Sequence, residues 1–298
     1  MDEYLERRVS NATVWSRRLA IFSAVVLLTA GVAHRIGFVA TPDMPAVLGV
    51  VGAIAILALA FAVRAVFLFW DHGGKGGGTL VFAILVALLV LTPFFITAYR
   101  GFTLPMMNDI STDPDDPPEF AIAAARRTAG MNAVEPFTPE RRKLQHDSYP
   151  AATGRRYEAP IGQVADVVSE VIERRGWTVV SPAAIPADAT EITIEAQAGS
   201  FLFGFPVDVA IRLIDEDTST YVDMRSASRY WPHDFGDNAA RIESFLAELD
   251  TEVAYLTVVT PVEPPEPPPP PPEPAEAAPP PEPAEPAEPL DRSEDPPD

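Results

Sequence analysis

Residues 79–98 read TLVFAILVALLVLTPFFITA, a stretch of twenty residues without a charged side chain. At about 1.5 Å per residue, a helix of this length spans the roughly 30 Å hydrocarbon layer of a membrane. A second apolar run covers residues 45–63 and continues through Arg64 to Trp70, and a shorter run covers residues 19–33. Three such runs in series predict an integral membrane protein, because helices that are apolar all round have nothing to pack against in a small soluble domain.

The first run is the shortest of the three. It ends at His34 and Arg35, so we expect residues 36–40, or snorkelling of the arginine side chain, to complete the span. A buried core helix and a cleaved signal peptide are the alternatives for this run. The charged stretch before it and the two further spans after it favour a retained anchor.

The basic residues predict the orientation of the spans. Arg35 and Arg100 lie on one side of the predicted membrane. Six basic residues lie on the other side: Arg7, Arg8, Arg17, Arg18, Arg64 and Lys75. An excess of lysine and arginine is typical of the cytoplasmic side. We therefore expect residues 1–18 in the cytoplasm, residues 19–100 in a bacterial inner membrane, and the rest of the chain in the periplasm.

Charge is divided unevenly along the chain. Residues 1–100 carry a net charge of +3 and residues 261–298 carry −10, so the section between them carries −13 of the total of −20. An acidic domain of this kind is a poor partner for nucleic acid and for an anionic lipid surface. Cysteine is absent, which excludes disulfides and thiolate metal sites and suits an oxidising compartment.

Residues 101–258 can form one α+β domain with a small antiparallel sheet. Apolar residues at helical spacing predict one helix that starts after Pro160 and stops at Gly176, and a second that starts near Asp237, a good N-cap residue. Alternation of apolar and polar residues predicts three strands between them, at residues 191–197, 207–213 and 220–227. This order is typical of a domain with helices covering one sheet face.

The segment before the first predicted helix is irregular. Residues 108–118 read NDISTDPDDPP, a run of turn formers that predicts a structured loop. Asp113, Asp115 and Asp116 resemble part of a calcium loop, but the glycine and the terminal glutamate of the EF-hand pattern are missing. The four histidines are isolated and have no zinc spacing. We expect neither a metal nor a cofactor.

The strand pattern also sends charged side chains to the second sheet face. If the apolar strand residues point into the core, the alternation along each strand places five charged residues on the opposite face of the sheet. These are Glu195, Asp208, Arg212, Asp223 and Arg225. One interpretation is a solvated face of cross-strand ion pairs, each contributing roughly 0.2–1 kcal/mol. The other is a recessed ligand site on the same face.

Several separated motifs, in the right order, resemble the uncharacterised family DUF1499. They are NDISTD at 108–113, RGW at 175–177, DMRSASR at 223–229, DFGDN at 234–238, and Arg241 with Ile242. Family members tend to have a paired aspartate where Val207 and Asp208 stand, and a glycine in place of the bulky residues around Tyr230 and Trp231. The resemblance covers about residues 108–249 and implies a domain and a membrane association, without an activity.

The same motifs contain the candidate site residues. Ser228, His233 and Asp234 are weak candidates for a hydrolytic site, because their spacing demands no triad and the Gly-x-Ser-x-Gly elbow is absent. The polar residues more naturally form a buried network that locks the last strand onto the last helix. Its predicted members are Asp223, Arg225, Arg229, Asp234, Asn238 and Arg241. Ligand binding by this group is the second interpretation.

Residues 259–298 predict an acidic, proline-rich and disordered tail, with eighteen prolines among residues 261–298. The tail would tether a basic envelope protein or simply keep the protein soluble. The chain as a whole predicts a membrane protein that acts in binding or scaffolding in the cell envelope, with the lipid bilayer as a partner and no nucleic acid. The alternative is a membrane-anchored hydrolase that uses Ser228, His233 and Asp234.

Overall fold

The computed structural model describes residues 9–72, 75–181 and 189–259. The first eight residues and nearly all of the predicted tail at 259–298 lie outside this part of the chain. The expectations for the tail therefore stay predictions.

Three helices are long and apolar enough to cross a membrane: α1 (Asn11–Arg35), α2 (Met44–His72) and α3 (Gly77–Thr103). They confirm that the three predicted apolar runs form candidate membrane spans, as in a membrane protein. A short 3₁₀ turn, η1 (Thr41–Asp43), precedes α2.

Helix α1 is longer than the apolar run at residues 19–33, but most of its extra residues come before residue 19, and none come from residues 36–40. It extends toward the N-terminus, where the Ser10 side chain accepts a hydrogen bond from the Thr13 amide at 3.1 Å and caps the helix. Residues 36–40 do not continue the helix, because α1 ends at Arg35 and the chain turns. Arg17 and Arg18 consequently lie within the helix.

The three spans pack through small side chains. Ala20 of α1, Ala58 of α2, and Ala83 and Ala87 of α3 are fully buried and form one cluster. Large apolar side chains such as Leu89, which is 72% exposed, point outward. Small residues allow helix backbones to approach closely in lipid, where apolar burial between helices supplies little driving force.

The alanine cluster generates a prediction for bundle stability. Ala58→Leu should destabilise the bundle by about 1–3 kcal/mol, because the added side chain has no space between α1 and α3. Ala60→Leu is the matched control, since Ala60 is exposed on the same helix. Unfolding of the full chain in mixed detergent micelles measures both variants, and equal losses would contradict this packing arrangement.

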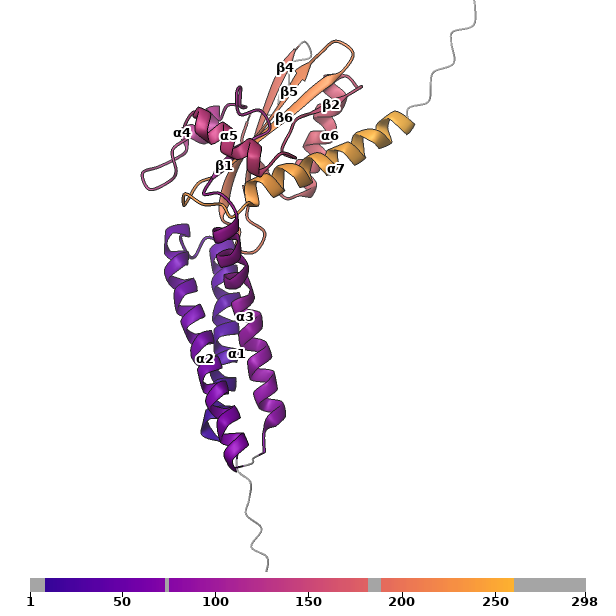
Figure 1. The fold of residues 1–298 in the computed structure, drawn as a ribbon. Coiled ribbons are helices and arrows are strands. Elements are labelled where there is room, and N and C mark those ends of the chain that lie inside the picture. The colour runs from indigo at the N-terminus through magenta and orange to yellow at the C-terminus, as the bar shows by residue number, and fades with distance from the viewer. Residues whose placement is uncertain (1–8, 73–74, 182–188, 260–298) are drawn as a thin grey trace, which may run out of the picture. The chain divides into compact units, whose positions relative to one another are not determined.

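Beyond α3 the chain forms an antiparallel sheet with helices (Figure 1). The strands are β1 (Asp109–Ser111), β2 (Arg155–Tyr157), β3 (Thr178–Val179), β4 (Glu191–Gly199), β5 (Pro206–Asp215) and β6 (Thr220–Ser228). The helices are α4 (Ala121–Ala125), α5 (Pro139–Ser148), α6 (Ile161–Arg174) and α7 (Asp237–Val259). The strand order is β1-β6-β5-β4-β3, and β2 also pairs with β6.

These elements confirm the predicted α+β domain and refine it. Strands β4, β5 and β6 and helices α6 and α7 match the predicted segments, with strand ends that extend by one or two residues. The prediction of a loop throughout residues 108–118 was wrong at its start. Asp109–Ser111 forms strand β1, because pairing with Arg225 to Ala227 of β6 satisfies its backbone groups.

One face of the sheet carries the apolar core. Alternate residues of the strands, such as Ile211 and Met224, are fully buried against α6 and α7. Phe245 of α7 contributes the largest fully buried side chain and stacks on Trp177 at 5.4 Å between ring centroids. The predicted inward set of strand residues is confirmed.

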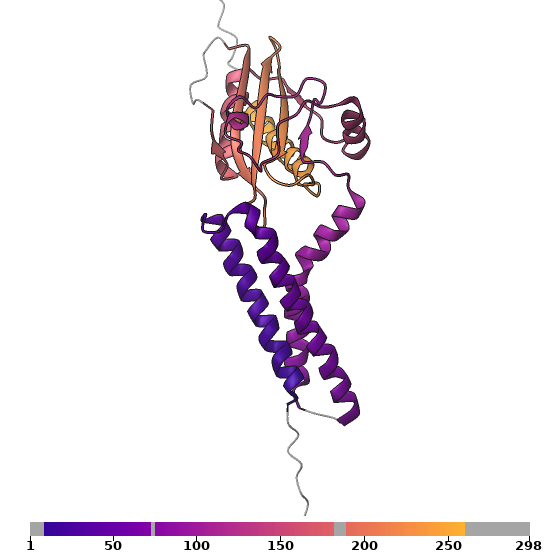
Figure 2. The ribbon, with the colours of Figure 1, turned by 90° about the vertical axis from the view of Figure 1, so that its left-hand side faces the viewer.

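The second face is also covered, and the expectation of a solvated face was wrong. A cover segment, residues 112–137, runs across it between β1 and α5 and includes the short helix α4 (Figure 2). Phe120 and Ala123 of this segment pack against Ala210 of β5 and Ala227 of β6. The sheet is therefore buried on both faces.

The hairpin between β4 and β5 contacts the end of the first span. The His34 Nδ1 atom lies 2.7 Å from the Phe203 carbonyl oxygen, and the Arg35 guanidinium donates to the Phe201 carbonyl. On the other side, Arg100 of α3 pairs with Asp237 at the start of α7 at 3.1 Å. Two of the three spans thus hold the domain through side chains at their ends.

Candidate functional site

The charged residues of the second sheet face are paired and buried. Glu195, Asp208, Arg212, Asp223 and Arg225 are all less than a tenth exposed. Their partners come largely from the cover segment and from β1, as well as from neighbouring strands. Removing a charge from water is costly unless the charge has a partner. The pairing of these side chains therefore allows the cover segment to bury the second sheet face.

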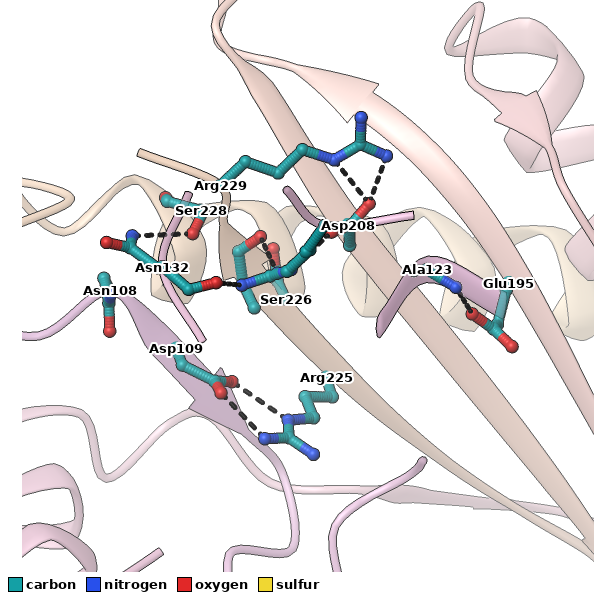
Figure 3. A network of polar contacts seen from close by, with 12 residues as sticks. Asn108, Asp109, Ala123, Asn132, Glu195, Asp208, Arg225, Ser226, Ser228 and Arg229 are labelled. Carbon is teal, nitrogen blue, oxygen red and sulfur yellow. Dashed lines mark hydrogen bonds and ion pairs between the residues drawn. The ribbon is translucent and has the colours of Figure 1, made fainter. Parts of the chain in front are cut away.

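Glu195 caps the short helix α4. One carboxylate oxygen accepts a hydrogen bond from the Ala123 amide at 2.8 Å (Figure 3). The other accepts from the Ile122 amide at 2.9 Å. A carboxylate is favourable there, because the first amides of a helix have no partner within the helix. The residue therefore fixes the cover segment to β4.

Asp208 lies between two arginines. The Arg229 guanidinium donates to its Oδ1 atom at 2.6 and 2.9 Å, and Arg127 of the cover segment lies 2.9 Å from its Oδ2 atom (Figure 3). Arg127 also donates to the carbonyl oxygens of Asn132 and Ala227. This carboxylate thus joins β5, the end of β6 and the cover segment.

Two more ion pairs lie farther along the same face. Arg225 makes a bidentate pair with Asp109 of β1 at 2.7 and 3.0 Å, and Arg212 pairs with Asp223 across β5 and β6 at 2.7 Å. Burial raises the pKa of the Asp223 carboxyl. The hydrogen bonds that Arg212 donates to Asp223 raise the pKa of Arg212. Asp116 of the cover segment adds a second carboxylate to Arg212.

A separate polar cluster lies on the core side of the sheet. The Ser226 hydroxyl lies 2.8 Å from the Asn238 Oδ1 atom, and the Asn238 amide group donates to the Ser228 hydroxyl at 3.1 Å. The Arg241 Nη1 atom donates to Ser226 and to Asn238 at 3.2 and 2.9 Å. These contacts join β6 to α7.

The structure therefore divides the residues predicted to form one network into two groups. Asn238 and Arg241 join the last strand to the last helix, as expected. Asp223, Arg225 and Arg229 lie on the opposite face and bind Arg212, Asp109 and Asp208. The period of two along β6 causes this division, because neighbouring residues of a strand point to opposite faces.

The candidate hydrolytic residues have separate partners. Asp234 accepts hydrogen bonds from the Gly236 and Asn238 amides at 2.9 and 3.0 Å, so it caps α7 in place of the predicted Asp237. Burial raises the pKa of the Asp234 carboxyl. The His233 Nδ1 atom accepts from the Phe235 amide at 3.1 Å. Within the described part of the chain, no hydrogen bond joins Ser228, His233 and Asp234 to one another.

Two cavities lie where the domain contacts the spans. One, of about 710 Å³, is bounded by α2, α3 and the side chains of Phe203, His233 and Phe235. The other, of about 600 Å³, lies between α6, α7 and the β4–β5 hairpin, and three arginines line it: Arg35, Arg175 and Arg241. No cluster of side chains suited to a metal ion occurs in residues 9–72, 75–181 and 189–259.

The comparisons with known proteins identify the domain. A family model described as "Protein of unknown function (DUF1499)" matches residues 109–249. Residues 109–249 are therefore a DUF1499 domain, which follows three candidate membrane spans. No curated protein matches the chain.

The turn after β6 has an unusual backbone conformation at Trp231. Trp231 has a φ of 64°, in the left-handed region that favours glycine. Its carbonyl oxygen accepts a hydrogen bond from the Asn132 side chain at 2.8 Å, which fixes the turn after β6.

Sequence reasoning missed several residues of the polar groups. Arg127, Asn132 and Asp109 were not assigned roles, although each contacts a predicted residue or its backbone. The signal for Arg127 was a basic pair directly after the short apolar sequence AIAAA at 121–125. In the sequence, Arg35 stands out as a residue at the end of the first apolar run and Arg175 as part of the RGW motif. Only the fold brings these two arginines together with Arg241.

The position of Asp208 generates a stability prediction. Asp208→Ala should lower the free energy of unfolding by about 3–5 kcal/mol, because it leaves the buried Arg127 and Arg229 without their carboxylate. Arg229→Ala should cost less, since Asp208 keeps Arg127. Urea unfolding of the full chain in detergent, monitored by tryptophan fluorescence, measures both losses.

The matched control is Asp166→Ala, which removes an exposed carboxylate of α6. It should change the free energy of unfolding by no more than about 0.5 kcal/mol. A loss for Asp208→Ala that is no larger than this control would show that the paired charges do not hold the cover segment.

Proposed function

We propose that the chain is an inner-membrane protein whose DUF1499 domain lies in the periplasm and acts in binding or scaffolding in the cell envelope. One observation carries the proposal: the candidate catalytic side chains are each engaged in structural hydrogen bonds. Ser228 is bound to Asn238, His233 to the Phe235 amide, and Asp234 to the start of α7. A hydrolase needs a nucleophile in contact with its base.

The location of the domain rests on the distribution of basic residues. The cytoplasmic side of a span is enriched in lysine and arginine. Six of these residues lie before α1, in its first two turns, or toward the loop between α2 and α3, against two on the domain side. The acidic character of the domain section favours a protein or small-molecule partner over nucleic acid. A basic envelope protein bound by residues 259–298 is a further partner within this proposal.

The orientation has a direct test. Alkaline phosphatase fused after residue 256 should be active, because the enzyme folds only outside the cytoplasm, and a fusion within residues 71–78 should be inactive. Green fluorescent protein fused at the same two points is the reciprocal control and should give the opposite pattern. Active phosphatase in the loop at 71–78 would place the domain in the cytoplasm.

The hydrolase alternative has its own test. The full chain in detergent should not react with a fluorophosphonate probe, because the Ser228 hydroxyl contacts no imidazole among the side chains that the structure describes. Ser228→Ala should lower the free energy of unfolding by about 0.5–1.5 kcal/mol, through loss of the hydrogen bond from Asn238. Labelling that disappears in Ser228→Ala would establish the hydrolase instead.

A further inference from the structure

We propose that the arginine-lined cavity binds the phosphate headgroup of an anionic membrane lipid. This inference rests on the proposed binding function of the domain and names its ligand class. The cavity lies between α6, α7 and the β4–β5 hairpin and has a volume of about 600 Å³. Arg35 comes from the end of α1, Arg175 follows α6, and Arg241 belongs to α7.

The lining of the cavity has an excess of positive charge. Asp237 is the carboxylate among its lining residues, and it pairs with Arg100 at 3.1 Å. Arg175 pairs with Glu248 at 2.7 Å, whereas Arg35 donates to the backbone carbonyls of the hairpin. Within a domain section of net charge −13, this local reversal of sign favours an anion.

Arg241 gives the strongest indication of a missing anion. The other buried or half-buried arginines of the sheet layer pair with carboxylates: Arg127, Arg212, Arg225 and Arg229. Arg241 has no ion pair within the described residues, and the protein groups that it contacts are the neutral oxygens of Ser226, Asn238 and the Asp237 backbone. A guanidinium withdrawn from water without a charged partner is unfavourable.

The geometry leaves part of the Arg241 guanidinium for a ligand. All of its described contacts use the Nη1 atom, so the Nε and Nη2 atoms are available for the paired hydrogen bonds that guanidinium makes with phosphate. Burial lowers the pKa of Arg241, the nearby Asp237 and Asp234 carboxylates oppose this lowering, and the charge of Arg175 adds to it. An anion between the two side chains would relieve this repulsion.

The other two arginines are held in place around the cavity. Arg175 donates to the Ser244 backbone and side chain at 2.7 and 3.1 Å and lies 5.5 Å from the ring centroids of Trp177 and Phe245. Arg35 is fixed through the hairpin carbonyls. Fixed donors bind an anion with little loss of side-chain freedom.

The membrane supplies the source of the phosphate. The Phe203 ring lies beside Gly31 of α1, so the hairpin tip lies along the last turns of a membrane span. Phe201 at this tip is 94% exposed, and Leu202 is half-exposed. Exposed apolar and aromatic side chains at the end of a span are typical of the headgroup region. A lipid there offers acyl chains to the hairpin and a phosphate to the arginines.

The test uses the full chain in a neutral detergent and measures binding by native mass spectrometry and by the change in Tm. The probes are dioctanoyl phosphatidylglycerol, dioctanoyl phosphatidylcholine and inorganic phosphate. Phosphatidylglycerol should bind and raise the Tm. Arg35→Gln and Arg241→Gln should each weaken this binding about tenfold, because each removes charge-assisted hydrogen bonds.

Arg174→Gln is the matched control, since Arg174 precedes Arg175 on the same helix but pairs with Glu248 and Glu252 and does not line the cavity. It should leave phosphatidylglycerol binding unchanged. If Arg241→Gln fails to fold, Arg35→Gln still decides the question, because Arg35 lies outside the domain core.

Three outcomes would overturn the proposal. They are unchanged binding in Arg35→Gln, equal binding of phosphatidylcholine, and an equal effect of inorganic phosphate, which would make the site one for a soluble anion. Failure here is separable from failure of the proposed function. If the lipid selectivity is lost, the domain could still act in binding or scaffolding with another ligand. If the chain shows serine-dependent fluorophosphonate labelling, binding or scaffolding is refuted as the function, but the lipid result is unaffected.

Discussion

A buried charge needs a partner, and the second face of the sheet is organised by this constraint. Asp208 holds Arg127 and Arg229, Glu195 holds the first amides of α4, and Asp109 holds Arg225. Apart from the pair of Asp208 with Arg229, each contact joins a strand to residues 109–137. The charges therefore take the place of the apolar packing that α6 and α7 provide on the first face. Removing one partner leaves the other stranded in a poorly solvated layer.

Strand β6 connects the two halves of this arrangement. The Asp223 and Arg225 side chains of the strand, and Arg229 directly after it, belong to the charged layer. Ser226 and Ser228 bind Asn238 on α7. The motif at 223–229 therefore has a structural explanation for its alternating polar residues. Among the described contacts, Arg241 of α7 keeps unused guanidinium donors, and with Arg35 and Arg175 it carries the proposal of a lipid site.

The sequence was sufficient for the spans, because their apolar runs are long enough to cross a membrane. It was sufficient for strands β4 to β6 and helices α6 and α7, because each has a strong period, and Gly176 marks the end of α6. It also predicted which strand residues point inward. The cover segment could not be predicted, because residues 112–137 have no period and acquire their path from contacts with distant strands. The sequence predicted charges such as Asp208 on that face, but their partners depend on long-range contacts that spacing does not encode.

The cover segment also imposes an order on folding. Strands β4, β5 and β6 are joined by short turns, so their pairing depends on local contacts that form early. The cover segment precedes these strands in the chain, yet Arg127 reaches its carboxylate 81 residues later. Its charges therefore stay in water until the sheet exists. The contact of Arg35 with the hairpin closes a still longer loop, so this contact can form only after β4 and β5 have paired.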